Sequence, residues 1–247
     1  MPQKIILFIG AIVVIVAALI GVVYFVNKDA PAVGGAPLQN DKGYTIQEVA
    51  IDEMPDYRRP VQYGDGVPAE ARAIIETRVA LAIAALDKDK TNPTAWYELG
   101  VLYKTANDLA GAEVIWEFLT RAAPNDATAF DNLGKMYHFD LRDFAKAEEY
   151  LKKSLAINPD ATTPYFELFD LYTLTLKNHT AAVDIMEKAA VHFPENSDFP
   201  YALGVYQRSR GNTVAARAYL EQAADLARAA GNLSLVSAIN AELAALP

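Results

Sequence analysis

The residues that could carry acid–base or metal chemistry in this chain are three histidines and several acidic pairs. His138, His179 and His192 lie in different segments, and no two of them have the spacing of metal ligands. The pair Glu148-Glu149 falls on a helical stretch, where solvated carboxylates are the default. No nucleophile is accompanied by a base and an orienting group. We therefore expect no enzyme activity, no catalytic or metal-ligating residue and no cofactor.

Composition excludes other kinds of chemistry. The chain has no cysteine, so it has no disulfide framework, no thiolate nucleophile and no cysteine-ligated metal. Val33-Gly34-Gly35 stands outside any strand-to-helix context and does not predict a phosphate loop. The net charge is −9, and the part after residue 26 is more acidic still, because Lys4 is the single charged side chain before it. So acidic a domain binds phosphate backbones poorly, and we expect no nucleic acid partner.

Residues 5–26 are uncharged and almost wholly apolar. As a helix they would span ~33 Å at ~1.5 Å per residue, which matches a hydrocarbon core of ~30 Å. The alternatives are a cleaved signal peptide, whose apolar region is shorter, and a buried core helix. We predict a single-pass transmembrane helix of the signal-anchor type after an N-terminal tail of residues 1–4. Lys4 favours a cytoplasmic tail and an extracytoplasmic domain, although Lys28 and Lys42 weaken this bias.

Residues 27–67 are predicted to link this helix to the domain. The first part, 27–43, is rich in Ala, Pro, Gly and polar residues and has no periodicity. The second part, 44–67, carries apolar residues that a tether does not need, together with prolines and glycines that disfavour a long helix. We expect this part to be extended and to pack on the first helices of the domain. A competing hypothesis places it in the domain's own binding groove.

Residues 68–91 are predicted to form an N-terminal capping helix. Pro68 suits the start of a helix, and Glu70 adds a negative charge to the first turn. Apolar residues then recur on one helical face, at Ile75, Val79, Ala82 and Leu86. This face is expected to cover the first of the units that follow.

Residues 92–232 contain a pattern that recurs four times, and the stretch from Trp96 to Pro124 is its most regular copy. Large residues lie at i, i+3 and i+7 of a first helix and a small one at i+4, while a second helix carries an alanine, a large apolar residue and a final proline. The members of the first unit are Trp96, Leu99, Gly100, Tyr103, Ala112, Trp116 and Pro124. Those of the second and third are Phe130, Leu133, Gly134, Tyr137, Ala147, Leu151, Pro159, Tyr165, Leu168, Phe169, Tyr172, Ala182, Met186 and Pro194, with one extra residue in each turn and with Phe169 in place of the small residue. The fourth has Leu203, Gly204, Ala216, Leu220 and Ala223, and the whole pattern resembles the tetratricopeptide repeat.

The pattern has a physical explanation that does not depend on the family. Small residues at Gly100, Gly134 and Gly204 are expected where paired helices cross, since a larger side chain would cost ~1–3 kcal/mol. No unit buries its faces alone, so each stacks on its neighbour. Residues 233–247, with Asn232 as N-cap, are expected to cap the last unit. The predicted fold is all-α: a right-handed α-solenoid of about four helix-turn-helix repeats with capping helices at both ends, preceded by one transmembrane helix.

The resemblance implies where a partner would bind. In this family the first helices line a concave groove, which suggests as partner-binding residues Tyr97, Val101, Lys104, Asp131, Lys135, His138, Phe139, Phe166, Asp170, Tyr201 and Arg208. The four aromatic residues stand where packing between helices does not demand them, and aromatics dominate interface energies. Tyr97 and Val101 occupy positions where members that clamp a C-terminal carboxylate have Lys and Asn, so we do not expect such a clamp.

We therefore predict a membrane-anchored protein-interaction scaffold or adaptor that binds an extended peptide or a partner protein of unknown identity in its groove. One alternative is a structural envelope component that self-assembles into a homo-oligomer. A second alternative is a glycan-binding module, because tyrosine-rich grooves can stack sugars.

Overall fold

The computed structural model describes residue 46 and residues 53–247, and these are all-α. The predicted membrane anchor and the linker 27–43 lie outside this part of the chain. Within it, no helix combines the length and the apolar character needed to cross a membrane.

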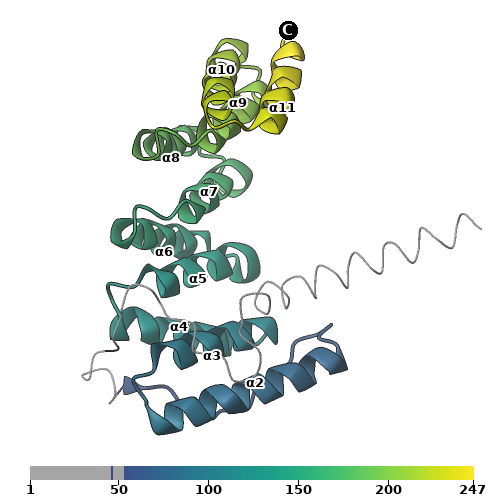
Figure 1. Ribbon diagram of the computed structural model, residues 1–247. Helices are drawn as coiled ribbons and strands as arrows, with labels where there is room; N and C mark the ends of the chain where they lie inside the picture. The colour runs from purple at the N-terminus through teal and green to yellow at the C-terminus, as the bar shows by residue number, and fades with distance from the viewer. Residues whose placement is uncertain (1–45, 47–52) are drawn as a thin grey trace, which may run out of the picture. The chain divides into compact units, whose positions relative to one another are not determined.

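The helices follow one another in pairs from α2 to α11 (Figure 1). Helix α2 (Ala69–Lys88) comes first and packs on α3. The four pairs are α3 (Pro93–Thr105) with α4 (Leu109–Ala122), α5 (Ala127–Met136) with α6 (Phe144–Ile157), α7 (Thr163–Asp170) with α8 (His179–His192), and α9 (Asp198–Ser209) with α10 (Thr213–Ala229). Helix α11 (Leu233–Ala244) packs on α10 and ends the series.

Short polar side chains begin the second helices. Asp108, Asp143 and Asn178 each accept a hydrogen bond from the backbone N–H three residues later, at 3.0–3.1 Å. Such a cap satisfies one of the N–H groups that the first turn of a helix leaves without a partner. The predicted cap Asn232 does the same for α11, accepting from the N–H of Leu235 at 3.1 Å.

The glycines of the first helices lie where the paired helices cross, as predicted. A Cβ on Gly134 would lie 2.6 Å from Cγ of Leu151, and one on Gly204 would lie 2.6 Å from Cγ of Leu220. A Cβ on Gly100 would overlap the ring of Trp116. The small residue of one helix therefore receives the large residue of the other, because a close-packed interior leaves no room for both side chains.

The extra residue of the second and third repeats is placed differently from the prediction. We expected it in the turn, but the first helices of these repeats end in π-helical turns, η2 (Tyr137–Leu141) after α5 and η3 (Leu171–Thr175) after α7. In η3 the N–H of Leu176 donates to the carbonyl of Leu171 at 2.9 Å, five residues back. A π-turn absorbs one residue without breaking the helix, so the connection to the next helix keeps its form.

Candidate functional site

The candidate surface is built by the first helix of each repeat, and we call it the first-helix face: the exposed or half-buried residues of α3, α5 with η2, α7 with η3, and α9. Neighbouring helices are tied together across it. Lys104 of α3 pairs with Asp140 of η2 at 2.7 Å, and Arg208 of α9 pairs with Glu242 of α11. Nε2 of His138 lies 3.3 Å from the hydroxyl of Thr175, which links η2 to η3. These contacts fix the spacing of the helices that would hold a ligand.

Several of the predicted residues are accessible on this face. Val101 and Phe139 are exposed, and Tyr97, Lys104 and Lys135 are half-buried. Lys135 forms an ion pair with Asp131 one turn away, at 2.8 Å. The basic groups Lys104 and Lys135 are therefore each matched with a carboxylate of the same face, and Arg208 is matched with Glu242 of α11.

The remaining aromatic and histidine side chains are more enclosed than the sequence suggested. Phe166 stacks on Phe199, with ring centroids 5.0 Å apart. Tyr201 packs against the apolar cluster that α10, α11 and Leu246 form. Packing therefore does demand these two aromatics. His138 is 6 % exposed, and the centroid of its ring lies 4.1 Å from that of the Phe139 ring.

Two carboxylates of α7 distinguish the centre of this face. Among the described residues, the side chains of Glu167 and Asp170 make neither a hydrogen bond nor an ion pair, and Glu167 is half-buried beside Lys135 and Asp131. Burial raises the pKa of Glu167, and Lys135 opposes that shift. Burial also raises the pKa of Asp170, which lies near His138. Burial lowers the pKa of His138, which disfavours the charged form of this ring.

Residues 53–67, which we call the strap, lie against the first repeat rather than forming a helix. Tyr57 packs edge-on to Trp96, with ring centroids 5.6 Å apart. The hydroxyl of Tyr103 donates to the carbonyl of Arg59 at 3.1 Å. In the next repeats the equivalent tyrosines Tyr137 and Tyr172 donate to carboxylates of the preceding second helix, at 2.5 and 2.8 Å. The strap thus supplies to Tyr103 the acceptor that a carboxylate of the preceding second helix supplies in the later repeats.

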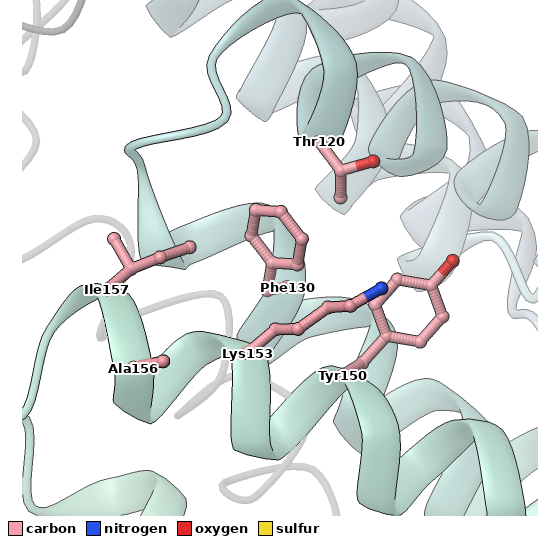
Figure 2. A pocket seen from close by; sticks show the side chains of 6 residues that line it. All are labelled: Thr120, Phe130, Tyr150, Lys153, Ala156 and Ile157. Atoms are coloured by element: carbon pink, nitrogen blue, oxygen red, sulfur yellow. The ribbon is translucent and has the colours of Figure 1, made fainter.

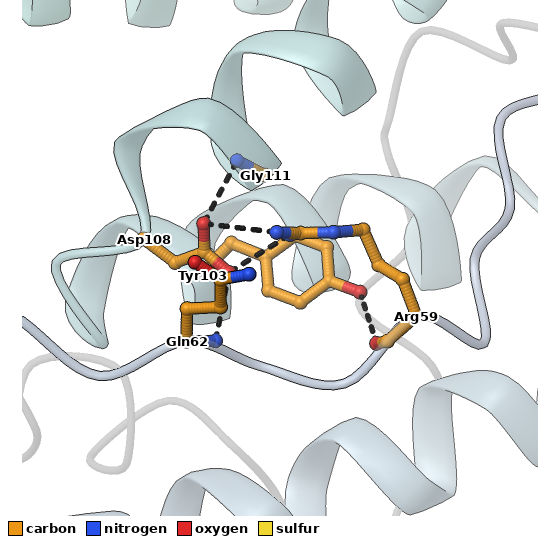
Figure 3. A network of polar contacts seen from close by, with 5 residues as sticks. All are labelled: Arg59, Gln62, Tyr103, Asp108 and Gly111. Carbon is orange, nitrogen blue, oxygen red and sulfur yellow. Dashed lines mark hydrogen bonds and ion pairs between the residues drawn. The ribbon is translucent and has the colours of Figure 1, made fainter.

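Asp108 anchors the strap (Figure 3). Its carboxylate accepts from the guanidinium of Arg59 at 2.8 Å, from the N–H of Gln62 at 2.9 Å and from the N–H of Gly111 at 3.0 Å. Burial alone would raise the pKa of Asp108, but these three donors outweigh it and hold the pKa below its ordinary value. The strap contacts therefore fall on Asp87 of α2 and on Trp96, Tyr103 and Asp108, the packing side of the first repeat, which favours packing over groove occupancy.

A concavity lies between the first two repeats, at the edge formed by α4, α5 and α6. It has a volume of about 420 Å³, and its walls come from Thr120, Phe130, Tyr150, Lys153, Ala156 and Ile157 (Figure 2). Figure 2 shows the Lys153 side chain alongside the ring of Tyr150, and the ammonium lies 5.4 Å from that ring's centroid. Sequence reasoning missed this concavity because its walls come from three helices whose side chains share no periodic signal.

The described residues contain no cluster of acidic, histidine or cysteine side chains suited to a metal ion. The three histidines lie apart: His138 bonds Thr175, His179 stands between Tyr206 and Arg210, and His192 pairs with Asp160 at 2.8 Å. Each histidine nitrogen that has a partner contacts another side chain of the fold. The arrangement offers a surface for recognition.

Comparison with known proteins identifies the repeats. Models of the tetratricopeptide repeat match residues 127–161 and 174–232. Among solved structures, the crystal structure of MamA is 18 % identical, covers 69 % of this chain and 99 % of its own, and superposes with a TM-score of 0.54. A structure described as the functional characterization of Pseudomonas aeruginosa pilF is 15 % identical, covers 70 % and 84 %, and has a TM-score of 0.51. At these identities the likeness shows the fold. No curated protein matches the chain.

Proposed function

Because the chain carries tetratricopeptide repeats, which imply a protein-interaction scaffold, we propose that its first-helix face binds an extended segment of a partner protein. The observation that carries this proposal is the exposure of Phe139, which is 58 % exposed in η2 on the first-helix face. A large aromatic ring held outward by a buried histidine is suited to contact a partner, since aromatic side chains bring large contact area at low entropic cost.

The experiment is site-specific photocrosslinking on the full chain in cells. A probe replaces Phe139 on the first-helix face, and a matched probe replaces Val214, which is 87 % exposed on the second helix α10. We expect the Phe139 probe to capture a discrete partner, mapped by mass spectrometry to one extended segment. Capture of the same partner with equal yield from Val214 would refute binding at the first-helix face.

We further propose that residues 5–26 anchor the scaffold in a membrane, with the repeats on the extracytoplasmic side. The support is their length and apolar sequence. Membranes from cells that produce the full chain are washed with alkaline carbonate and treated with protease from the outside. We expect the full chain to remain in the pellet and its repeats to be digested, while a chain without residues 5–26 stays in the supernatant. Extraction of the full chain by carbonate would refute anchoring.

A self-assembling role is the second candidate from the sequence. Light scattering of residues 45–247, which form one compact unit, separates it from partner binding. A mass that stays monomeric over a hundredfold range of concentration contradicts self-assembly through this unit.

A further inference from the structure

Two large apolar side chains stand out from the π-helical ends of neighbouring first helices. Phe139 of η2 is 58 % exposed, and Leu174 of η3 is 66 % exposed. Each is adjacent in sequence to a member of the His138–Thr175 contact, which spans 3.3 Å, so the two side chains start from neighbouring points of the two helix ends. Apolar side chains gathered on a surface mark sites of interaction. The π-turns produce this patch, because each shifts the end of its helix by one residue.

The charge beside this patch is negative and unmatched. Glu167 and Asp170 lie on α7, and Asp170 is one turn before Leu174. Among the described residues neither carboxylate has a hydrogen bond or an ion pair, while Lys135 is engaged by Asp131 at 2.8 Å. Carboxylates held half-buried without a partner are costly, and a bound cation would remove that cost.

A buried group next to these carboxylates is also unsatisfied. His138 is 6 % exposed, and its Nδ1 makes no hydrogen bond to any described residue. The ring lies close enough to Asp170 to act on it electrostatically. Among the described residues, the carboxylate oxygens of Glu167 and Asp170 are acceptors without a donor at this point, which is the complement of an ammonium or guanidinium group.

We propose that the acidic–apolar surface, made of Phe139, Glu167, Asp170 and Leu174, binds a peptide segment that carries a lysine or arginine next to a large apolar residue. The cation lies between the carboxylates of Glu167 and Asp170, and the apolar side chain packs on Phe139 and Leu174. This inference rests on the proposed function and specifies the chemistry of its partner. Charge complementarity with Glu167 and Asp170 requires a positive group on the partner. That charge is opposite in sign to the C-terminal carboxylate that some members of the family clamp.

The test measures binding of the full chain, in detergent micelles, to an array of nonapeptides with randomised sequences. We expect peptides with Lys or Arg beside Leu or Phe to bind at least tenfold more tightly than the same peptides with Glu. The Glu167→Gln, Asp170→Asn double variant should lose about tenfold or more of this preference, because charge-assisted hydrogen bonds are replaced by neutral ones. Since neither carboxylate holds a partner within the described fold, this variant keeps its circular dichroism spectrum.

A matched control makes the same change of charge elsewhere. Asp184→Asn, Glu221→Gln removes two exposed carboxylates from the second helices α8 and α10, and it should leave the preference intact. Phe139→Ser should weaken the binding of basic and neutral peptides alike. A preference that survives in the Glu167→Gln, Asp170→Asn variant overturns the inference.

The inference and the proposed function fail in different ways. Peptide binding that depends on Phe139 but shows no preference for Lys or Arg refutes the basic segment and leaves the binding face in place. Absence of any peptide binding that depends on Phe139 refutes both. A preference lost equally in the Asp184→Asn, Glu221→Gln control shows a response to net charge and also refutes the inference.

Discussion

Replacing Asp108 by alanine tests whether the strap is a structural part of the first repeat. The change removes the N-cap of α4 and, at the same time, the acceptor of Arg59 and of the Gln62 amide. Asp143→Ala is the matched control, because Asp143 caps α6 in the same way but is exposed and accepts only from Lys146. The difference between the two losses of stability therefore measures what the strap contacts of Asp108 contribute.

The magnitudes follow from the contacts. Loss of an N-cap costs ~1 kcal/mol, and this is the whole effect expected for Asp143→Ala. Asp108 is 5 % exposed and makes a charge-assisted bond with Arg59 in addition, which contributes ~1.5–3 kcal/mol. The side chain of Arg59 is 27 % exposed, so water recovers part of that loss. We therefore expect Asp108→Ala to cost about 3 kcal/mol.

The assay uses the position of the tryptophans. The chain has two, Trp96 and Trp116, and both belong to the first repeat. Urea unfolding of residues 45–247 is followed by tryptophan fluorescence, which reports the first repeat, and by circular dichroism, which reports all helices. Repeats unfold partly as separate units. Asp108→Ala should shift the fluorescence transition further than the circular dichroism transition, and Asp143→Ala should not.

Equal losses of stability for the two variants would refute the reasoning, because the strap would then contribute nothing through Asp108. A second check is the double variant with Arg59→Ala. If the two side chains act as a pair, removing both costs less than the sum of the single losses, by ~1–3 kcal/mol. The pKa of Asp108 lies below its ordinary value, so its contribution is present at neutral pH and is lost as the pH falls below about 4.

The crossing of the paired helices predicts that Gly134→Val costs ~2 kcal/mol or more of the free energy of unfolding in urea, because a Cβ there lies 2.6 Å from a leucine of α6. The control Ala145→Val, on the exposed side of α6, should cost under ~1 kcal/mol. Tyr137→Phe, which loses the 2.5 Å bond to Glu113, should cost ~1 kcal/mol, and no change would contradict that bond's role. Glu167→Gln should raise the thermal midpoint of unfolding at pH 7. Burial raises the pKa of Glu167, so ionisation of this side chain costs the wild type stability as the pH rises above about 4.5. A gain in the thermal midpoint that persists at pH 4 would contradict this origin.

Residue spacing along the chain was enough to predict the repeats. The positions of Trp96, Gly100 and Ala112 recur from one repeat to the next, and each of them has one place in a stack of paired helices. The cap at Asn232 was likewise readable, because capping depends on a residue and the backbone three positions later. Local rules therefore determined the order of the helices and the repeated core positions within them.

Contacts over long sequence distances were decided only by the tertiary structure. Arg59 and Asp108 are 49 residues apart, and nothing in either local pattern pairs them. The extra residue after Tyr137 could be counted, but whether it widened a turn or a helix depended on packing against the neighbouring repeat. Phe166 is turned into a stack with Phe199 of the next repeat, while Phe139 is left outward. Periodicity assigns a residue to a helix face, whereas its exposure depends on which neighbour covers that face.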